Sequence, residues 1–266
     1  MTAQTPTFIH DFRQAAPYIH YLRGKKLVVA ISSHVLLTEK LASLAADIQL
    51  LASLGVRLVL LHGSRQYLNR MVGAHGQSLN YHQGWRVTDE ATLQLAKQAS
   101  GLARFDLEAA LSATPAQAPD RSAQTLQISS GNFLLAKPLG VLDGIDMGYT
   151  GRVRKVDVQA IEERLANGQV VLVSPLGHSL SGKSYNLGMD DVAQALAVSL
   201  KAEKLIFLST ESGLCDAQGE VISQMTSAEA ETLLQTVPQK ADVTRMLKAA
   251  VYVLEHGVRR AHIVSG

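Results

Sequence analysis

Three short polar segments, each placed directly after an apolar run, could bind an anion. They are Ser32-Ser33-His34, His62-Gly63-Ser64-Arg65 and Ser174-Pro175-Leu176-Gly177-His178. If the apolar runs are parallel strands, the segments meet at the carboxyl edge of one sheet, where α/β proteins bind their ligands. Backbone N–H groups at such turns bind phosphate or carboxylate, and glycine lets the anion come close. The pattern predicts an anion site, or the remnant of one.

Glycine is scarce in these segments, which argues against a nucleotide site. The sequence has no G-x-x-x-x-G-K-[ST] motif and no strong G-x-G-x-x-G motif. Ser32 and Ser33 carry side chains where a closely bound phosphate would need none. Ser64 and Arg65 stand where a run of glycines could otherwise continue from Gly63. The segments alone therefore favour a remnant over a working phosphate site.

Three further side chains could act on a carboxylate or a phosphoryl group. Arg86 precedes a predicted helix and could bind a carboxylate bidentately, although a surface pairing with Asp89 or Glu90 is an equal alternative. Asn186 and Asp190 stand near the start of another predicted helix. Asp190 could organise phosphoryl chemistry, or both side chains could simply cap the helix.

Several other functions find little support in the composition. The net charge of +2, without a run of five basic residues, argues against a nucleic-acid partner. Cys215 is the only cysteine, so no internal disulfide forms, which fits a reducing cytoplasm. No apolar run approaches the roughly 20 residues that span a membrane, and the polar N-terminus is unlike a secretion signal. The nine histidines show no metal-binding spacing, and no Gly-x-Ser-x-Gly elbow occurs.

Apolar runs and helical patterns alternate along the chain and would position these residues. Thr88 is the expected N-cap of a pair of helices at 88–113, and Pro17 is expected to kink or break a first helix that ends at Gly24. The fold class is therefore α/β, one domain with helices on both faces of a mostly parallel sheet. The expected strands are 26–32, 56–63, 169–177, 203–210 and 259–266, and the other expected helices are 36–55, 158–168, 189–202, 227–235 and 243–257. An antiparallel hairpin at the sheet edge is expected to pair 125–140 with 148–157. A loop is expected at 114–124 and a hairpin turn at 212–223.

Six segments together resemble the N-terminal domain of bacterial N-acetylglutamate synthases of the arginine-regulated kind, which has the amino-acid kinase fold. The fold is a three-layer αβα arrangement with a mostly parallel central sheet. The segments are FRQAAPYIHYLRGK, DIQLLASLGVRLVLLHGSR, YHQGWRVTDEATLQLAKQASG, SGNFLLAKPLGVLDGIDMGYTGRVRKVD, SLKAEKLIFLSTESGL and HGVRRAHIVSG.

The resemblance implies a regulatory domain at 25–266 that binds L-arginine, after an N-terminal helix at 1–24 that serves as an oligomer contact or arginine lid. A homo-oligomer is expected, because the helix has an apolar stripe and the family interlaces such helices between subunits. The family makes N-acetyl-L-glutamate from acetyl-CoA and L-glutamate, the first step of arginine biosynthesis, in a separate C-terminal domain of the GCN5-related type. The chain stops before that C-terminal domain, and the regulatory domain itself is expected to be truncated at its C-terminal end. It is therefore expected to hold no catalytic residue and no cofactor, and to transfer no acetyl group by itself.

The related acetylglutamate kinases, which phosphorylate N-acetylglutamate with ATP, are the alternative. In those kinases a lysine precedes paired glycines, where this chain has Ala30, Ser32 and Ser33. Losing the lysine removes a cation from the migrating phosphoryl group. Arg86 matches an arginine that holds the substrate carboxylate, and Asp190 matches a retained aspartate. The resemblance thus implies vestigial phosphate and substrate loops, formed by Ser32, Ser33, His62, Gly63, Ser64, Arg86, Asn186 and Asp190.

The arginine site can be transferred from the family in part. The resemblance places it between the N-terminal helix and the carboxyl edge of the sheet, at Tyr18, Lys201, Lys204 and His262. A lysine would pair with the carboxylate of arginine, and an acid beyond Gly266 would pair with its guanidinium. The alternative for Lys201 and Lys204 is an ordinary basic helix end. A third possibility is an arginine-sensing or scaffold module without chemistry.

Overall fold

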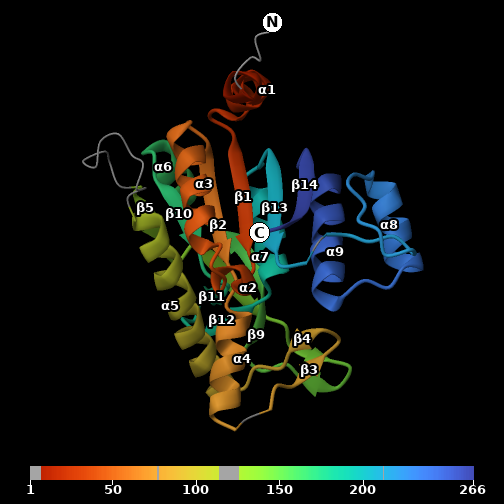
Figure 1. Ribbon diagram of the computed structural model, residues 1–266. Coiled ribbons are helices and arrows are strands. Elements are labelled where there is room, and N and C mark those ends of the chain that lie inside the picture. Colours follow the sequence, from red (N-terminus) through yellow and green to blue (C-terminus); the bar gives the residue numbers. More distant parts are fainter. Residues whose placement is uncertain (1–6, 77, 114–125, 212) are drawn as a thin grey trace, which may run out of the picture.

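The computed structural model describes residues 7–76, 78–113, 126–211 and 213–266. Its main sheet has six strands in the order β14-β13-β1-β2-β10-β5, and every neighbouring pair is parallel (Figure 1). The predicted parallel sheet is confirmed. The strands are β1 (Lys26–Ile31), β2 (Arg57–His62), β5 (Ile128–Ser130), β10 (Val170–Val173), β13 (Lys204–Ser209) and β14 (Arg260–Ser265).

Side chains of the central strands alternate between two apolar layers, because successive residues of a strand point to opposite faces. In β1, Leu27 and Val29 belong to one buried cluster, whereas Val28 and Ala30 belong to the other. Helices cover both faces, so the predicted three-layer arrangement is confirmed. The first layer contains α2 (Ser33–Leu36), α3 (Leu41–Ser53), α4 (Arg65–Ala74) and α5 (Glu90–Ser112), and the second α6 (Val158–Ala166), α7 (Met189–Ser199) and α9 (Ala241–Glu255), with α8 (Ser227–Thr236) packed on α9.

The predicted antiparallel pair exists, but its predicted place at the edge of the main sheet is wrong. β6 (Leu134–Pro138) and β9 (Thr150–Val156) pair with each other and close a separate four-stranded barrel with β11 (Leu176–His178) and β12 (Ser184–Leu187). The edge is occupied by β5 instead. The alternation of apolar and polar residues in a strand pair specifies which face of the pair is buried. It does not specify which other strand lies beside the pair.

Two short hairpins project near the carboxyl edge of the main sheet. They are β3 (Tyr81–His82) with β4 (Trp85–Arg86), and β7 (Val141–Leu142) with β8 (Ile145–Asp146). A bridge between Cys215 and Val221 confirms the predicted turn in that part of the chain. The predicted loop at 114–124 lies outside the described residues.

Two expected helix breaks are absent. The pair expected at 88–113 is one helix, α5, because the buried stripe that includes Leu93, Ala103 and Leu107 continues across Gly101. Packing of that stripe outweighs the roughly 1 kcal/mol that an interior glycine costs a helix. Pro17 lies inside α1 (Thr7–Leu22) without ending it. A proline inside a helix removes one backbone hydrogen bond and crowds the carbonyl of the residue four positions earlier.

The helix α1 lies at the end of the sheet opposite to the hairpin β3–β4 (Figure 1). It leads into β1 through only Arg23, Gly24 and Lys25, so it must lie at the amino edge of the sheet. Within the described residues, no helix is long and apolar enough to cross a membrane.

Candidate functional site

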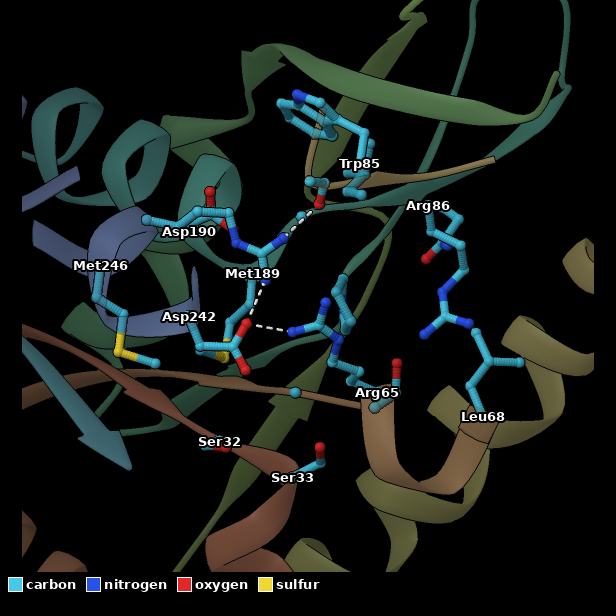
Figure 2. A pocket seen from close by; sticks show the side chains of 18 of the residues that line it. Ser32, Ser33, Arg65, Leu68, Trp85, Arg86, Met189, Asp190, Asp242 and Met246 are labelled. Atoms are coloured by element: carbon cyan, nitrogen blue, oxygen red, sulfur yellow. Dashed lines mark hydrogen bonds and ion pairs between the residues drawn. The ribbon is translucent and has the colours of Figure 1, made fainter. Parts of the chain in front are cut away.

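A cavity of about 130 Å³ lies at the carboxyl ends of β1, β2 and β10, with the hairpin β3–β4 on its other side (Figure 2). The expectation that the three polar segments meet at one site is confirmed, because residues of all three line the cavity. His62 lies just outside the lining and is fully buried. The predicted site residues that do line the cavity are Ser32, Ser33, Gly63, Ser64, Arg86, Asn186 and Asp190.

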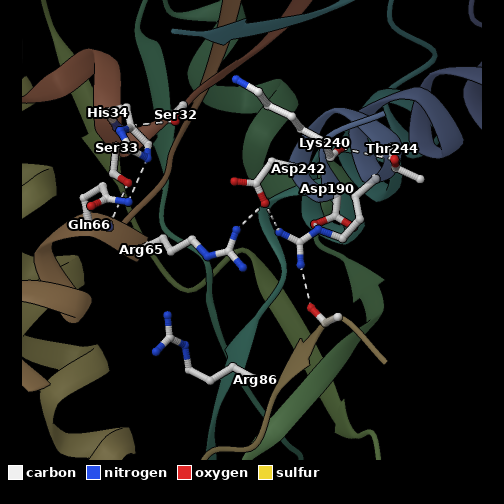
Figure 3. A network of polar contacts seen from close by, with 12 residues as sticks. Ser32, Ser33, His34, Arg65, Gln66, Arg86, Asp190, Lys240, Asp242 and Thr244 are labelled. Carbon is white, nitrogen blue, oxygen red and sulfur yellow. Dashed lines mark hydrogen bonds and ion pairs between the residues drawn. The ribbon is translucent and has the colours of Figure 1, made fainter. Parts of the chain in front are cut away.

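The two serines after β1 use their hydroxyl groups to satisfy backbone N–H groups (Figure 3). Ser32 is the N-cap of α2, and its side chain accepts the N–H of His34 at 3.3 Å. Ser33 is 2% exposed, and its hydroxyl accepts the N–H of Gln66, in the first turn of α4, at 3.0 Å. The N–H groups of His34 and Gln66 therefore already have acceptors.

His62 and Gly63 hold the loops together. A Cβ at Gly63 would lie 3.0 Å from the backbone nitrogen of Ser33, so a glycine is needed for this close approach. The imidazole Nε2 of His62 lies 2.8 Å from the hydroxyl of Ser174. Burial, with a smaller effect from the charge of Arg104, lowers the pKa of His62 to about 4, so the imidazole is neutral near pH 7.

Two arginines and two aspartates form an ion-pair network across the cavity (Figure 3). Arg65, at the start of α4, donates to Asp242 on α9. Arg245 also donates to Asp242, at 2.7 Å, and its Nε lies 3.9 Å from a carboxylate oxygen of Asp190. Arg245 further donates to the carbonyl oxygen of Gly84 in the hairpin β3–β4, at 2.7 Å. The network joins α4, α7, α9 and the hairpin.

Arg86 is the third arginine of the cavity and is only 8% exposed. Its Nη2 donates to Asn69 at 2.8 Å, whereas its buried Nη1 has no partner among the described residues. Burial lowers the pKa of Arg86, and the nearby charges of Arg65 and Arg245 add to this. The alternative of a surface pairing with Asp89 or Glu90 is wrong, because the guanidinium lies against the cavity (Figure 2).

Two expected helix caps are corrected by the structure. Asp89 is the N-cap of α5, and its carboxylate accepts the N–H of Thr92 at 2.7 Å. Thr88 is fully buried and accepts a hydrogen bond from Thr150 at 2.9 Å instead. Asn186 lies on β12, not at a helix start, and donates to Thr88 at 3.3 Å. Asp190 does lie in the first turn of α7, as expected.

Sequence reasoning missed Arg245 and Asp242 as members of the site. Both lie near the start of α9, and Asp242 follows its partner Arg65 by 177 positions. No local motif marks such a long-range pair. The available signal was a helix start that carries charges of both signs within four residues.

Three of the four residues predicted to bind arginine lie at the amino edge of the sheet, not at the carboxyl edge, and the fourth, His262, lies within β14. Lys204 begins β13, and Lys201 is exposed just before it, whereas Tyr18 is 65% exposed on α1. His262 lies on β14 opposite Ile206 of β13, and its Nε2 has no partner among the described residues. Burial lowers the pKa of His262, and the charge of Lys204 adds to this effect. The predicted edge is wrong because α1 is tied directly to the start of β1.

An acid that sequence reasoning missed lies at this amino edge. The side chain of Glu203 is 14% exposed and accepts a hydrogen bond from Tyr21 of α1. Its carboxylate also lies 3.8 Å from a guanidinium nitrogen of Arg259 and 3.9 Å from the ammonium of Lys25. Across the described part of the chain, no three His, Cys, Asp or Glu side chains gather where they could hold a metal ion.

Known proteins resemble the chain over almost its whole length. The amino acid kinase family matches residues 25–265. An amino-acid acetyltransferase of Neisseria meningitidis serogroup A is 42% identical over 262 residues, which are 97% of this chain and 58% of that protein. The chain therefore spans less than two thirds of that relative.

Solved structures agree with this similarity. The N-acetylglutamate synthase of Neisseria gonorrhoeae, complexed with coenzyme A and L-arginine, has a TM-score of 0.92 and 41% identity, covering 97% of this chain and 60% of that one. Carbamate kinase from Giardia lamblia has a TM-score of 0.67 at 14% identity, covering 91% of this chain and 92% of that one, which shows the shared fold alone.

Proposed function

The chain belongs to the amino acid kinase family, and we propose that it is the arginine-binding regulatory part of an N-acetylglutamate synthase. Such an enzyme transfers the acetyl group of acetyl-CoA to L-glutamate. The observation that carries the proposal is the 41% identity over 97% of this chain to a synthase complexed with coenzyme A and L-arginine. Acetyl transfer itself is assigned to the part of the relatives that the match does not cover.

The cavity supports a regulatory role over phosphoryl transfer. No lysine is present among the described residues that line it, and its serines already bind the N–H groups that would hold a phosphate. The position that carries a lysine in the kinases is Ala30, which is fully buried. Electrostatic stabilisation supplies most of phosphoryl-transfer catalysis, so a site without this cation is poorly suited to it.

The amino edge offers the groups that a free arginine requires. Lys201 and Lys204 can pair with its carboxylate, and Glu203 can pair with its guanidinium. Glu203 already lies 3.8 Å from the guanidinium of Arg259, so its surroundings admit this group. Binding at this place would act directly on α1, because Tyr21 donates to the same carboxylate.

Calorimetric titration of the chain with L-arginine tests the proposal. We expect saturable binding, and weaker binding of L-citrulline, whose neutral side chain cannot form an ion pair. Glu203→Gln and Lys204→Met should each weaken binding at least tenfold. Lys248→Met, at an exposed position of α9, is the matched control. A folded chain that binds no L-arginine would contradict the proposal.

A second assay addresses the kinase alternative. The chain is incubated with N-acetylglutamate and Mg-ATP, and release of ADP is followed through coupled enzymes. We expect no turnover above the rate without N-acetylglutamate. Steady turnover would overturn the regulatory assignment, whatever the arginine titration shows. The same chain supplied with acetyl-CoA and L-glutamate is expected to form no N-acetylglutamate.

A further inference from the structure

The carboxylate of Asp242 lies between two guanidinium groups that face the cavity. Arg65 and Arg245 both donate to its Oδ1, from α4 and from α9 itself (Figure 3). Asp190 adds a second negative charge next to Arg245. With Arg86, the cavity thus holds three cations and two anions. Within the described residues, the buried Nη1 of Arg86 and Nε of Arg245 have no hydrogen-bond acceptor, and that Nε lies 3.9 Å from a carboxylate oxygen of Asp190.

The same network holds the hairpin β3–β4 against the cavity. Arg245 donates to the carbonyl oxygen of Gly84 at the hairpin turn. The guanidinium groups of Arg65 and Arg86 lie 5.4 and 4.9 Å from the ring centroid of Tyr81. Asp242 pairs with both Arg65 and Arg245, so this carboxylate is connected to the hairpin through two arginines, beside the separate contacts of the hairpin with Asp143.

We propose that the carboxylate of Asp242 is an internal anion. It occupies the place that a bound oxyanion would take, and it keeps the hairpin β3–β4 closed over the cavity. Its charge balances Arg65 and Arg245, which would otherwise repel each other and Arg86. Without this charge, three guanidinium groups face one small cavity that keeps only the carboxylate of Asp190. A small oxyanion with several acceptor oxygens then binds in its place, because arginine pairs with such anions bidentately.

Binding of inorganic phosphate tests this exchange, measured by calorimetry at constant ionic strength set with chloride. Asp242→Asn should bind phosphate at least tenfold more tightly than the unchanged chain. Asp242→Glu keeps the charge and should behave like the unchanged chain. Asp47→Asn makes the same charge change at an exposed position of α3 and is the control. Equal phosphate affinity of Asp242→Asn and the unchanged chain would overturn the proposal.

The fluorescence of Trp85 reports the hairpin directly, because it is the only tryptophan of the chain and lines the cavity. Quenching by acrylamide should increase at least twofold in Asp242→Asn and in Arg245→Gln. Arg245→Gln loses the bond to Gly84 and keeps the proposal testable if Asp242→Asn does not fold. Phosphate should reverse the increase in Asp242→Asn. Unchanged quenching in a folded Arg245→Gln variant would contradict the closed hairpin.

Discussion

Ser33 accepts the N–H of Gln66 at 3.0 Å while its own side chain is 2% exposed. Ser33→Ala leaves this donor without an acceptor, which costs about 1–2 kcal/mol of unfolding free energy. Ser32→Ala, which removes a longer bond at the more exposed cap of a four-residue helix, should cost about 0.5 kcal/mol. Urea unfolding of both variants measures the difference. Equal losses would show that Ser33 has no special role in joining α2 to α4.

His62 predicts a pH dependence of stability. Burial lowers its folded-state pKa to about 4, whereas an unfolded chain takes up the proton near the ordinary value of about 6.5. The unfolded state therefore binds more protons between these values, and stability falls as the pH decreases from 6.5 to 4. The total loss from this residue is roughly 3 kcal/mol.

Comparison of His62→Gln with the unchanged chain isolates this contribution from that of other titrating groups. Urea unfolding between pH 4 and 7 should show a shallower decrease for the variant. His20→Gln, at an exposed position of α1, should retain the full decrease. The same pH dependence in His62→Gln and in the unchanged chain would mean that His62 takes up its proton in the folded state.

Among the elements, the contact between the end of β4 and the start of β9 depends on Gly148. Its φ angle is +58°, and a Cβ there would lie 2.4 Å from the carbonyl oxygen of Thr88. Gly148→Ala should therefore lose about 2–4 kcal/mol of unfolding free energy. Gly140→Ala shares a positive φ of +84° but has open space, so about 1 kcal/mol is expected. Similar losses from urea unfolding would show that the contact with Thr88 is unimportant.

Elements whose patterns are local could be predicted from the sequence. A continuous apolar run marked β1 and β2, and a helical pattern marked the start of α7, within one or two residues of their observed ends. The cap of α5 was misplaced by one residue, because Thr88 and Asp89 have the same capping chemistry and only tertiary packing buries Thr88.

The site was predictable where it follows the strand ends and unpredictable where it depends on distant pairs. The serine and glycine loops meet because parallel strands place their carboxyl ends together. The pairing of Arg65 with Asp242 joins positions 177 residues apart, and no spacing in the chain indicates it. Asn186 lies on β12, which pairs with β9 in the small barrel. The alternation of apolar and polar residues in a strand does not specify which strand is its neighbour.

For the whole molecule, α1 is the part least supported by the rest of the chain. Among the side chains that the structure describes, its contacts with the domain lie in the last turn, through Tyr21 and Leu22. A single helix of 16 residues is only marginally stable in water. Tyr18 nevertheless exposes 65% of its surface. A second copy of the chain is the partner that we propose for this helix.

Light scattering during size-exclusion chromatography tests this assembly. The chain should elute at a multiple of 28.6 kDa, and deletion of residues 1–20, which keeps Tyr21, should reduce that multiple. Tyr18→Ser should weaken the assembly, because it removes an aromatic contact, whereas Leu180→Ser, at a side chain that is 78% exposed elsewhere, should not. The deletion should change the melting temperature of the domain little, since few of its contacts reach α1. An undeleted chain that elutes at 28.6 kDa would show that α1 has no partner in a second copy of the chain.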